Sequence, residues 1–189
     1  MTMAHWQLFI RDCELGIILG KNYSKQLTRQ IGENLLVAKL GELGIVASTL
    51  TGNVPDIDIL AYHQDGKSFP IQVKTVRKGS VSVGNAEHFI KISFDETTNP
   101  PKIIQKVRGK QKINKDLIYV VIFCRKELEA AKFYICTQGD IQKIVDKNYR
   151  AHLVKVDSVR PKNPKSPHCT YKEKDLLKFE DNWDLILKT

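Results

Sequence analysis

The sequence predicts a single α/β domain. Three observations predict it: a segment with helical periodicity, several strand-like segments after it, and a second helical segment after residue 138. The length of 189 residues suits one domain with a sizeable core, and the 42% of hydrophobic and 27% of charged residues are typical of a folded globular chain. We expect the domain to span residues 24–189, preceded by an N-terminal extension over residues 1–23.

The first predicted element is a helix over residues 24–44. Its apolar positions recur close to every 3.6 residues, and they are Leu27, Ile31, Leu35 and Ala38. Ser24 suits the N-cap and Gly44 suits the end of the helix, because serine accepts hydrogen bonds from free N–H groups and glycine tolerates a left-handed conformation.

Strands follow this helix. The first is predicted over residues 45–51, and a Gly-Asn-Val-Pro turn leads to a second that carries Asp56 and Asp58. An Asp-Gly pair then indicates a hairpin turn before a return strand over residues 69–76. Further strands are predicted by their β-branched and aromatic content, over residues 89–94, 117–124 and 132–137.

The C-terminal third closes the predicted fold. A helix is expected after Gln138, with Ile141, Ile144 and Val145 facing inward. Residues 160–171 are rich in proline and lysine and are expected to form a loop. A short helix or turn then carries three further apolar residues, Leu176, Leu177 and Phe179.

Two of the strands carry polar side chains where a strand favours Ile and Val. Asp56 and Asp58 share one face of the first strand, and Gln72 and Lys74 share one face of the second, because side chains alternate along a strand. With a hairpin loop of three or five residues, Asp58 is expected opposite Lys74. A two-residue loop would instead point Asp58 away from Lys74. The loop therefore decides whether these groups converge.

Glu33 is a further candidate, because it lies in the apolar stripe of the first helix rather than on its solvated face. A carboxylate in that position is costly unless it is paired or binds a metal. Gly32 precedes it and permits the close approach of another backbone. Pairing with Arg29 is the simple structural alternative for Glu33.

Carboxylates and an amide carbonyl together favour a hard cation such as Mg²⁺. Asp58 would supply a carboxylate, Gln72 its side-chain oxygen and Val73 its backbone carbonyl, while Glu33 would hold a metal-bound water. Lys74 would orient or deprotonate the attacking water and offset charge on a phosphate. The simpler alternatives are a structural Asp58–Lys74 ion pair, a solvated Gln72, and Asp56 as the start of its strand.

The order Glu33, Asp58, Gln72-Val73-Lys74 resembles the PD-(D/E)xK nuclease superfamily. It is most similar to small bacterial endonuclease-like proteins with a Gly-Glu helix, an Asp-Ile-Leu-Ala strand and an Ile-Gln-Val-Lys-Thr strand. The tail from Lys178 to Asp184 also looks like the end of such proteins.

The resemblance implies a restriction-endonuclease-like mixed β-sheet flanked by helices, with an αβββαβ core, and Mg²⁺-dependent hydrolysis of DNA phosphodiesters, with Mn²⁺ as a substitute. It assigns the metal-ligand position to Asp58, the catalytic lysine position to Lys74, the second acidic position to Gln72 and the helical acid to Glu33.

Two departures from the family pattern matter. The literal Pro-Asp pair is Pro55-Asp56, whereas the Ile-Leu-Ala run points to Asp58, which we favour because it can lie opposite Lys74. Gln72 replaces the usual acid, so the site loses one negative charge and is expected to hold Mg²⁺ less tightly. A catalytically weakened or inactive protein that binds nucleic acid is therefore the alternative function, and a complex-forming protein is a third.

The charge balance favours a polyanionic partner, because the net charge is +9 and the isoelectric point is about 9.3. DNA is the expected partner, and the candidate contacts lie just after the Gln72 strand and in the basic run over residues 102–115. These contacts are Arg77, Lys78, Lys106, Arg108 and Lys110. A solvated charged connection is the alternative for the basic run.

No apolar run approaches the length of a membrane span, so no membrane partner is expected. The four cysteines have no CxxC spacing, and buried free thiols in a reducing cytoplasm are the expectation. A homodimer is a further expectation, because two cuts on a duplex would favour one.

Overall fold

A computed structural model describes residues 21–50, 54–98, 100–124 and 130–189. The expected N-terminal extension therefore lies almost entirely outside the described residues, and its boundary stays a prediction. The first described element is helix α3, Lys21–Glu42. It ends where Gly44 adopts a φ of 79°, and the Ile45 N–H donates back to the Leu40 carbonyl at 2.9 Å, which closes the last turn.

The core of the protein is a five-stranded mixed sheet. Its strands are β1 (Val46–Thr49), β2 (Ile59–Tyr62), β3 (Ser68–Val76), β7 (Ile118–Phe123) and β8 (Lys132–Thr137). Their spatial order is β1-β2-β3-β7-β8. The β3–β7 pair is parallel and the other pairs are antiparallel, so the long connection from β3 to β7 has to cross from one end of the sheet to the other.

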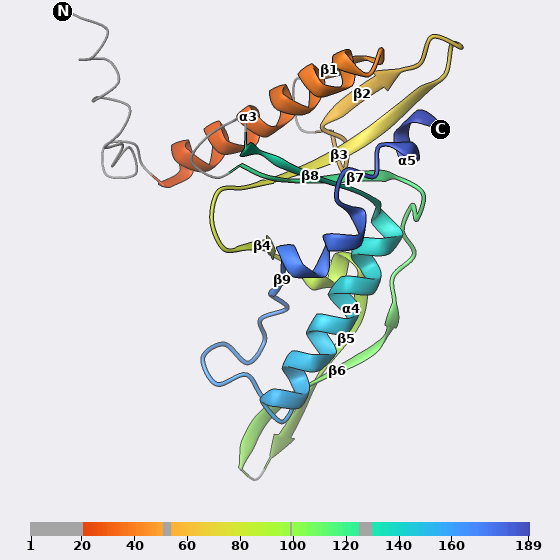
Figure 1. Ribbon diagram of the computed structural model, residues 1–189. Coiled ribbons are helices and arrows are strands. Elements are labelled where there is room, and N and C mark those ends of the chain that lie inside the picture. The colour runs from red at the N-terminus through yellow and green to blue at the C-terminus, as the bar shows by residue number, and fades with distance from the viewer. Residues whose placement is uncertain (1–20, 51–53, 99, 125–129) are drawn as a thin grey trace, which may run out of the picture.

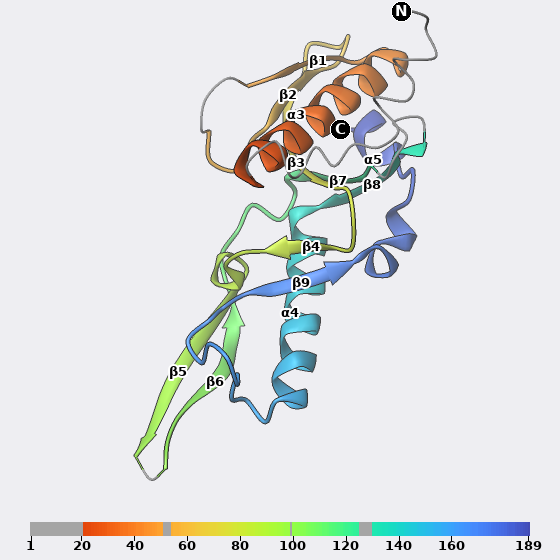
Figure 2. The ribbon, with the colours of Figure 1, turned by 90° about the vertical axis from the view of Figure 1, so that its left-hand side faces the viewer.

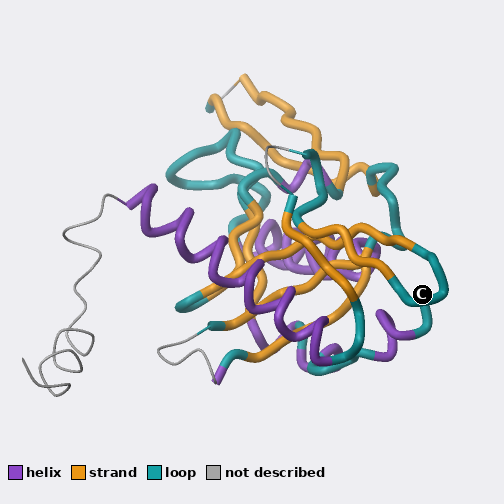
Figure 3. The backbone as a smooth tube through the Cα atoms, turned by 90° about the horizontal axis from the view of Figure 1, so that it is seen from above, coloured by secondary structure: helices purple, strands orange, loops and turns teal. Residues whose placement is uncertain are grey.

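Helices cover the two faces of this sheet (Figures 1 and 3). On one face, Leu36 and Leu40 of α3 pack in a cluster with Ile71 and Val73 of β3. On the other face lies α4, Gln138–Lys155, and its buried residues join those of β7 and β8. The residues of α4 at this contact are Ile141, Val145, Tyr149 and Leu153. The sheet is thus the middle layer of an α/β sandwich.

The crossover between β3 and β7 carries most of the remaining strands. Strand β4, Ser80–Val83, pairs with β9, Cys169–Lys172. A short 3₁₀ turn over Ala86–His88 then leads to an antiparallel ribbon of two long strands. They are β5 (Ile90–Thr98) and β6 (Pro101–Lys110). Figures 1 and 2 show this ribbon projecting away from the five-stranded sheet alongside α4.

Local capping defines the start of α4. The Thr137 hydroxyl accepts from the Asp140 N–H, and the Asp140 carboxylate accepts from the Thr137 N–H, so the helix begins in a reciprocal capping box. Partial burial acts to raise the pKa of Asp140, but hydrogen bonds from Lys143 and Thr137 outweigh it and hold the pKa below its ordinary value. After β9, the chain forms three short helical elements. They are η3 (Glu173–Asp175), η4 (Leu177–Phe179) and α5 (Asp184–Leu187).

The predicted fold class is confirmed as a mixed sheet flanked by helices, although the order of elements differs from αβββαβ. The crossover before β7 contains strands rather than a helix, and α4 follows β8. The basic run over 102–115 is mainly strand β6 rather than a plain connection, and the expected loop over 160–171 ends in β9. Ser24 is not the N-cap, because α3 already begins at Lys21.

Two smaller observations concern the cysteines and the helices. The three described cysteines, Cys124, Cys136 and Cys169, are free and buried, as predicted, while Cys13 lies outside the described residues. In the part of the chain that is described, no helix is both long and apolar enough to cross a membrane.

Candidate active site

Three charged side chains meet where α3 passes the start of β2. One guanidinium nitrogen of Arg29 donates to the Asp58 carboxylate at 2.5 Å, and another donates to the Glu33 carboxylate at 2.7 Å. The Asp58 side chain is only 4% exposed and that of Glu33 13%, whereas Arg29 is 58% exposed. The hydrogen bond to Glu33, together with the Asp58 charge, raises the pKa of Arg29, so this bridge stays cationic.

Asp58 is bound from the sheet side as well. One carboxylate oxygen accepts from the backbone N–H of Val73 at 2.8 Å and from the side-chain amide of Gln72. Its own N–H donates to the Ile71 carbonyl at 3.0 Å. The hydrogen bonds from these donors replace the water that the buried Asp58 carboxylate loses.

A close approach of helix and strand brings these groups together. A Cβ atom added to Gly32 would lie 1.8 Å from the Thr75 hydroxyl, so only glycine lets α3 lie this close to β3. Glu33 is the next residue and Arg29 lies one turn earlier. The contact that the Gly32-Glu33 pair indicated in the sequence is therefore present.

The expected register of the β2–β3 hairpin was wrong. Ile59 pairs with Ile71 and Tyr62 with Ser68, so Asp58 meets Gln72 and Val73 rather than Lys74. The loop over residues 63–67 has five residues, one of the two expected lengths, but a five-residue loop sets Tyr62 opposite Ser68, so the expected register was displaced by two residues. The shift is even, so Gln72 and Lys74 keep their predicted face of β3, whereas the prediction that Asp56 and Asp58 share a strand face is wrong, because both precede β2 and Asp56 lies in a turn. No ion pair joins Asp58 and Lys74 among the described side chains, and the structural alternative for that pair is wrong too.

The two aspartates have different surroundings. Asp56 is exposed and has a φ of 60° in a turn whose Ile57 N–H points back to the Val54 carbonyl at 3.4 Å. Aspartate tolerates this left-handed conformation better than most residues, but at some cost in strain. Asp56 is therefore held at the surface beside the buried Asp58.

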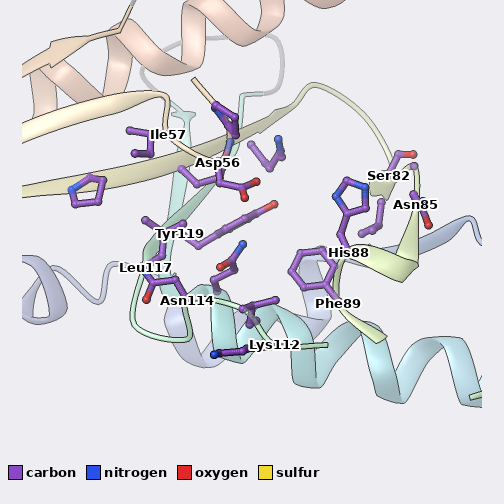
Figure 4. A pocket seen from close by; sticks show the side chains of 18 residues that line it. Asp56, Ile57, Ser82, Asn85, His88, Phe89, Lys112, Asn114, Leu117 and Tyr119 are labelled. Carbon is purple, nitrogen blue, oxygen red and sulfur yellow. The ribbon is translucent and has the colours of Figure 1, made fainter. Parts of the chain in front are cut away.

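A cleft of about 910 Å³ adjoins this cluster, with Asp56, Gln72 and Lys74 on one wall. Residues at the base of the β5–β6 ribbon form the opposite wall, and they include His88, Phe89 and Lys112. In Figure 4, the Tyr119 hydroxyl and the Asp56 carboxylate point toward the same part of the cleft. Burial raises the pKa of Tyr119, so its hydroxyl is a hydrogen-bond donor rather than a base.

The structure brings together Glu33, Asp58 and Gln72, with Val73 contributing its N–H, and places Lys74 two residues further along β3 in the cleft. Gln72 is buried, so its solvated alternative is wrong, while the Arg29–Glu33 alternative is confirmed. Sequence reasoning did not predict that Arg29 also reaches Asp58. It also missed Tyr119, whose only signal was a tyrosine inside an apolar strand.

The predicted nucleic-acid contacts lie in two places. Arg77 and Lys78 are exposed in the turn that follows β3. Lys106, Arg108 and Lys110 are exposed on β6, where Lys106 and Arg108 pair with Asp95 at 2.9 and 3.2 Å. The two groups lie on different elements, and none of these five residues lines the cleft, which the base of the β5–β6 ribbon borders.

The carboxylates of Glu33 and Asp58 fit a divalent cation on the condition that Arg29 moves aside. Two carboxylates around one position provide the oxygen ligands that Mg²⁺ prefers, and Arg29 already places a positive charge between them. The exposed Arg29 side chain has solvent to move into, so a cation would enter by displacing it. Gln72 fits less well as a ligand, because its nitrogen must face the Asp58 carboxylate and its oxygen therefore points away. Across the described ranges, no group of three His, Cys, Asp or Glu is gathered as a metal site.

No protein-family model matches the chain, and no curated protein matches it in sequence. Among solved structures, the chain is similar to one described as a bacterial homing endonuclease, I-Ssp6803I. The identity is 15%, the match covers 87% of this chain and 94% of that chain, and the TM-score is 0.41. A likeness of this extent assigns neither a family nor an activity, so function rests on the chemistry of the site.

Proposed function

We propose that this protein is a metal-dependent endonuclease that hydrolyses DNA phosphodiester bonds at the Glu33–Asp58–Gln72–Lys74 site. The observation that carries the proposal is the Arg29 guanidinium held between two largely buried carboxylates, 2.7 and 2.5 Å away. This arrangement marks a position that attracts a cation, and it lies next to a cleft lined by a lysine.

Mg²⁺, with Mn²⁺ as a substitute, is the proposed cofactor. Asp58 and Glu33 would hold it, with the Val73 carbonyl and the Gln72 side-chain oxygen as the weaker members of the set. When bound, such an ion supplies an activated water and offsets the charge that develops on the phosphate.

Side chains of the protein would bind the phosphates and orient the attacking water. Lys74 is exposed in the cleft and has no ion-pair partner among the described residues, so its ammonium group is available for a phosphate oxygen or for the attacking water. Arg77, Lys78 and Lys110 would hold phosphates on either side of the scissile bond. A cytoplasmic homodimer is part of this proposal, because a double-strand cut needs two such sites.

A second function is favoured by one specific contact. The Asp58 carboxylate accepts hydrogen bonds from the Gln72 amide, the Val73 N–H and the Arg29 guanidinium. A carboxylate with so many donors is a weaker metal ligand, which supports the alternative of a DNA-binding protein with little or no cleavage activity.

The test is nicking or linearisation of supercoiled plasmid, with Mg²⁺ or Mn²⁺ and with EDTA. Wild type is expected to cut only with metal, and Lys74→Ala is expected to lose at least 100-fold in rate. Lys67→Ala is the matched control, because Lys67 is an exposed lysine at the far end of the same hairpin. Equal cutting by Lys74→Ala and the control would contradict the assignment. DNA binding without cutting would favour the second function.

A further inference from the structure

The β5–β6 ribbon has an unusual shape for a surface hairpin. Its strands, Ile90–Thr98 and Pro101–Lys110, pair only with each other among the described strands. Nine paired residues span roughly 30 Å at about 3.3 Å per residue. Figures 1 and 2 show the ribbon extending beyond the body of the protein.

One face of the ribbon is fixed to the body. Gln105 of β6 is fully buried, its amide donates to the Pro164 carbonyl at 2.5 Å, and its oxygen accepts from the Tyr149 hydroxyl at 2.5 Å. Ile92 and Val107 of the same face pack against the core cluster that contains α4 residues. The ribbon is therefore held in a defined position, and its other face is left free.

The outer face is polar and mainly basic. Arg108 bonds to the Ser93 hydroxyl at 2.9 Å and to Asp95 at 3.2 Å, and Lys106 bonds to Asp95 at 2.9 Å. These contacts gather two long cationic side chains on the outer face of the ribbon, where both stay more than half exposed. Glu96, the other acid of the ribbon, is neutralised by Lys165 at 2.9 Å. The exposed cations of the ribbon and its C-terminal extension are Lys91, Lys102, Lys106, Arg108, Lys110 and Lys112.

The base of the ribbon is part of the cleft. His88 and Phe89 lead into β5, Lys112 follows β6, and all three line the cleft opposite Lys74. A phosphodiester held at Lys74 would therefore lie at the foot of the ribbon, and a nucleic acid that continues from it would run along the ribbon.

We propose that the β5–β6 ribbon enters the major groove of duplex DNA, and that Lys106 and Arg108 reach base edges there. The major groove of undeformed DNA is about 12 Å wide and admits a two-stranded ribbon, whereas the minor groove is only about 6 Å wide. An exposed arginine on this face matches guanine O6 and N7, and the outer cations such as Lys102 match phosphates. This inference takes DNA as the substrate from the proposed function and adds that it is a duplex, read through its major groove.

The test compares two duplexes that have the same sequence and differ only in the major groove. In one, every cytosine carries a glucosyl group at C5, which fills the major groove and leaves the phosphates and the minor groove unchanged. Binding is measured by fluorescence anisotropy in EDTA, so that no cleavage occurs. Wild type is expected to bind the glucosylated duplex and the matching single strand at least tenfold more weakly than the plain duplex.

The variant that tests the named residues is the double substitution Lys106→Ala with Arg108→Ala. It is expected to bind the plain duplex at least tenfold more weakly and to lose its discrimination between the two duplexes. The control removes the same charge from another surface, between α4 and η3, by Lys147→Ala with Lys174→Ala, and is expected to keep the discrimination. Thermal unfolding of each variant checks that the fold is unchanged.

Equal binding of wild type to both duplexes, or full discrimination in the double variant, would overturn the inference. Plasmid cleavage together with equal binding of the two duplexes would support the proposed nuclease function and contradict the inference about the ribbon. Weaker binding of the glucosylated duplex without plasmid cleavage would support the inference about the ribbon and contradict the proposed nuclease function.

Discussion

Replacing Arg29 by methionine tests whether the bridging guanidinium occupies a cation position. Methionine keeps much of the length and the helix propensity of arginine but removes the charge and both hydrogen bonds. Asp58 would keep the Val73 N–H and the Gln72 amide as donors, and Glu33 would lose the guanidinium. We therefore expect a destabilised protein without metal and a better metal site.

The magnitude follows from the two contacts. Hydrogen bonds to charged groups contribute about 1.5–3 kcal/mol each, but Arg29 is 58% exposed, so water screens and partly replaces them. We take about 2 kcal/mol for the pair after this discount. In a domain of this size, that lowers the midpoint of thermal unfolding by roughly 4–8 °C. If metal must break the same contacts to enter, its affinity rises roughly 30-fold in the variant.

The assay is thermal unfolding in EDTA and across a Mg²⁺ or Mn²⁺ titration, with calorimetric titration for the dissociation constant. At a metal concentration of about 100 times that constant, binding adds about 2.7 kcal/mol to stability, which recovers the loss. Arg150→Met is the matched control, because Arg150 pairs with Asp146 at 2.7 Å on an exposed face of α4. It is expected to cost at most about 0.5 kcal/mol and to leave metal binding unchanged.

The reasoning is refuted if metal stabilises Arg29→Met no more than it stabilises wild type. In that case, the two carboxylates would form an ion pair with Arg29 for structural reasons alone, and the metal would have to bind elsewhere or not at all.

Two further predictions concern the framework of the site. Gly32→Ala is expected to lower the free energy of unfolding by about 1–3 kcal/mol in chemical denaturation, because the new Cβ would lie 1.8 Å from the Thr75 hydroxyl. Gly41→Ala is the control in the same helix, has nothing within 4 Å of its new Cβ, and is expected to be neutral or stabilising by up to about 1 kcal/mol. Equal effects of the two substitutions would contradict the packing argument. The pKa of Asp140 is lowered in the folded state, so its contribution is present above the unfolded value of about 3.9 and is lost as pH falls through the folded value. Asp140→Asn is therefore expected to cost about 1 kcal/mol at pH 7 and progressively less below about pH 4, and a cost that does not change with pH would refute this.

Local patterns predicted the main sheet and both long helices well. The strand Lys132–Thr137 has its predicted bounds, and Gly44 ends the first helix as expected, because both signals depend on neighbouring residues alone. The β5–β6 ribbon was only half predicted. Its second strand contains lysines and an arginine at alternate positions, and that pattern indicates a solvated run unless a partner strand is known.

The site shows the same limit. The polar residues of β3 and the Gly32-Glu33 pair indicated a buried polar cluster, and the structure brings Glu33, Asp58 and Gln72 together. The contact of Asp58 with Gln72 instead of Lys74 follows from the loop length, because a five-residue loop sets Tyr62 opposite Ser68. The expected register differed by two residues, a shift that the alternation of faces does not reveal. That Arg29 reaches Asp58 depends on the tertiary packing of α3 on β3, which no local pattern encodes.

The most direct test of the nuclease account is plasmid cleavage by Gln72→Glu beside wild type, with Mg²⁺ or Mn²⁺. The substitution removes the amide that donates to Asp58 and adds a carboxylate beside it as a further oxygen ligand for a metal. We predict metal-dependent cleavage by wild type and cleavage at least as fast by Gln72→Glu. Intact plasmid with both proteins, in either metal and with DNA bound, would contradict the account.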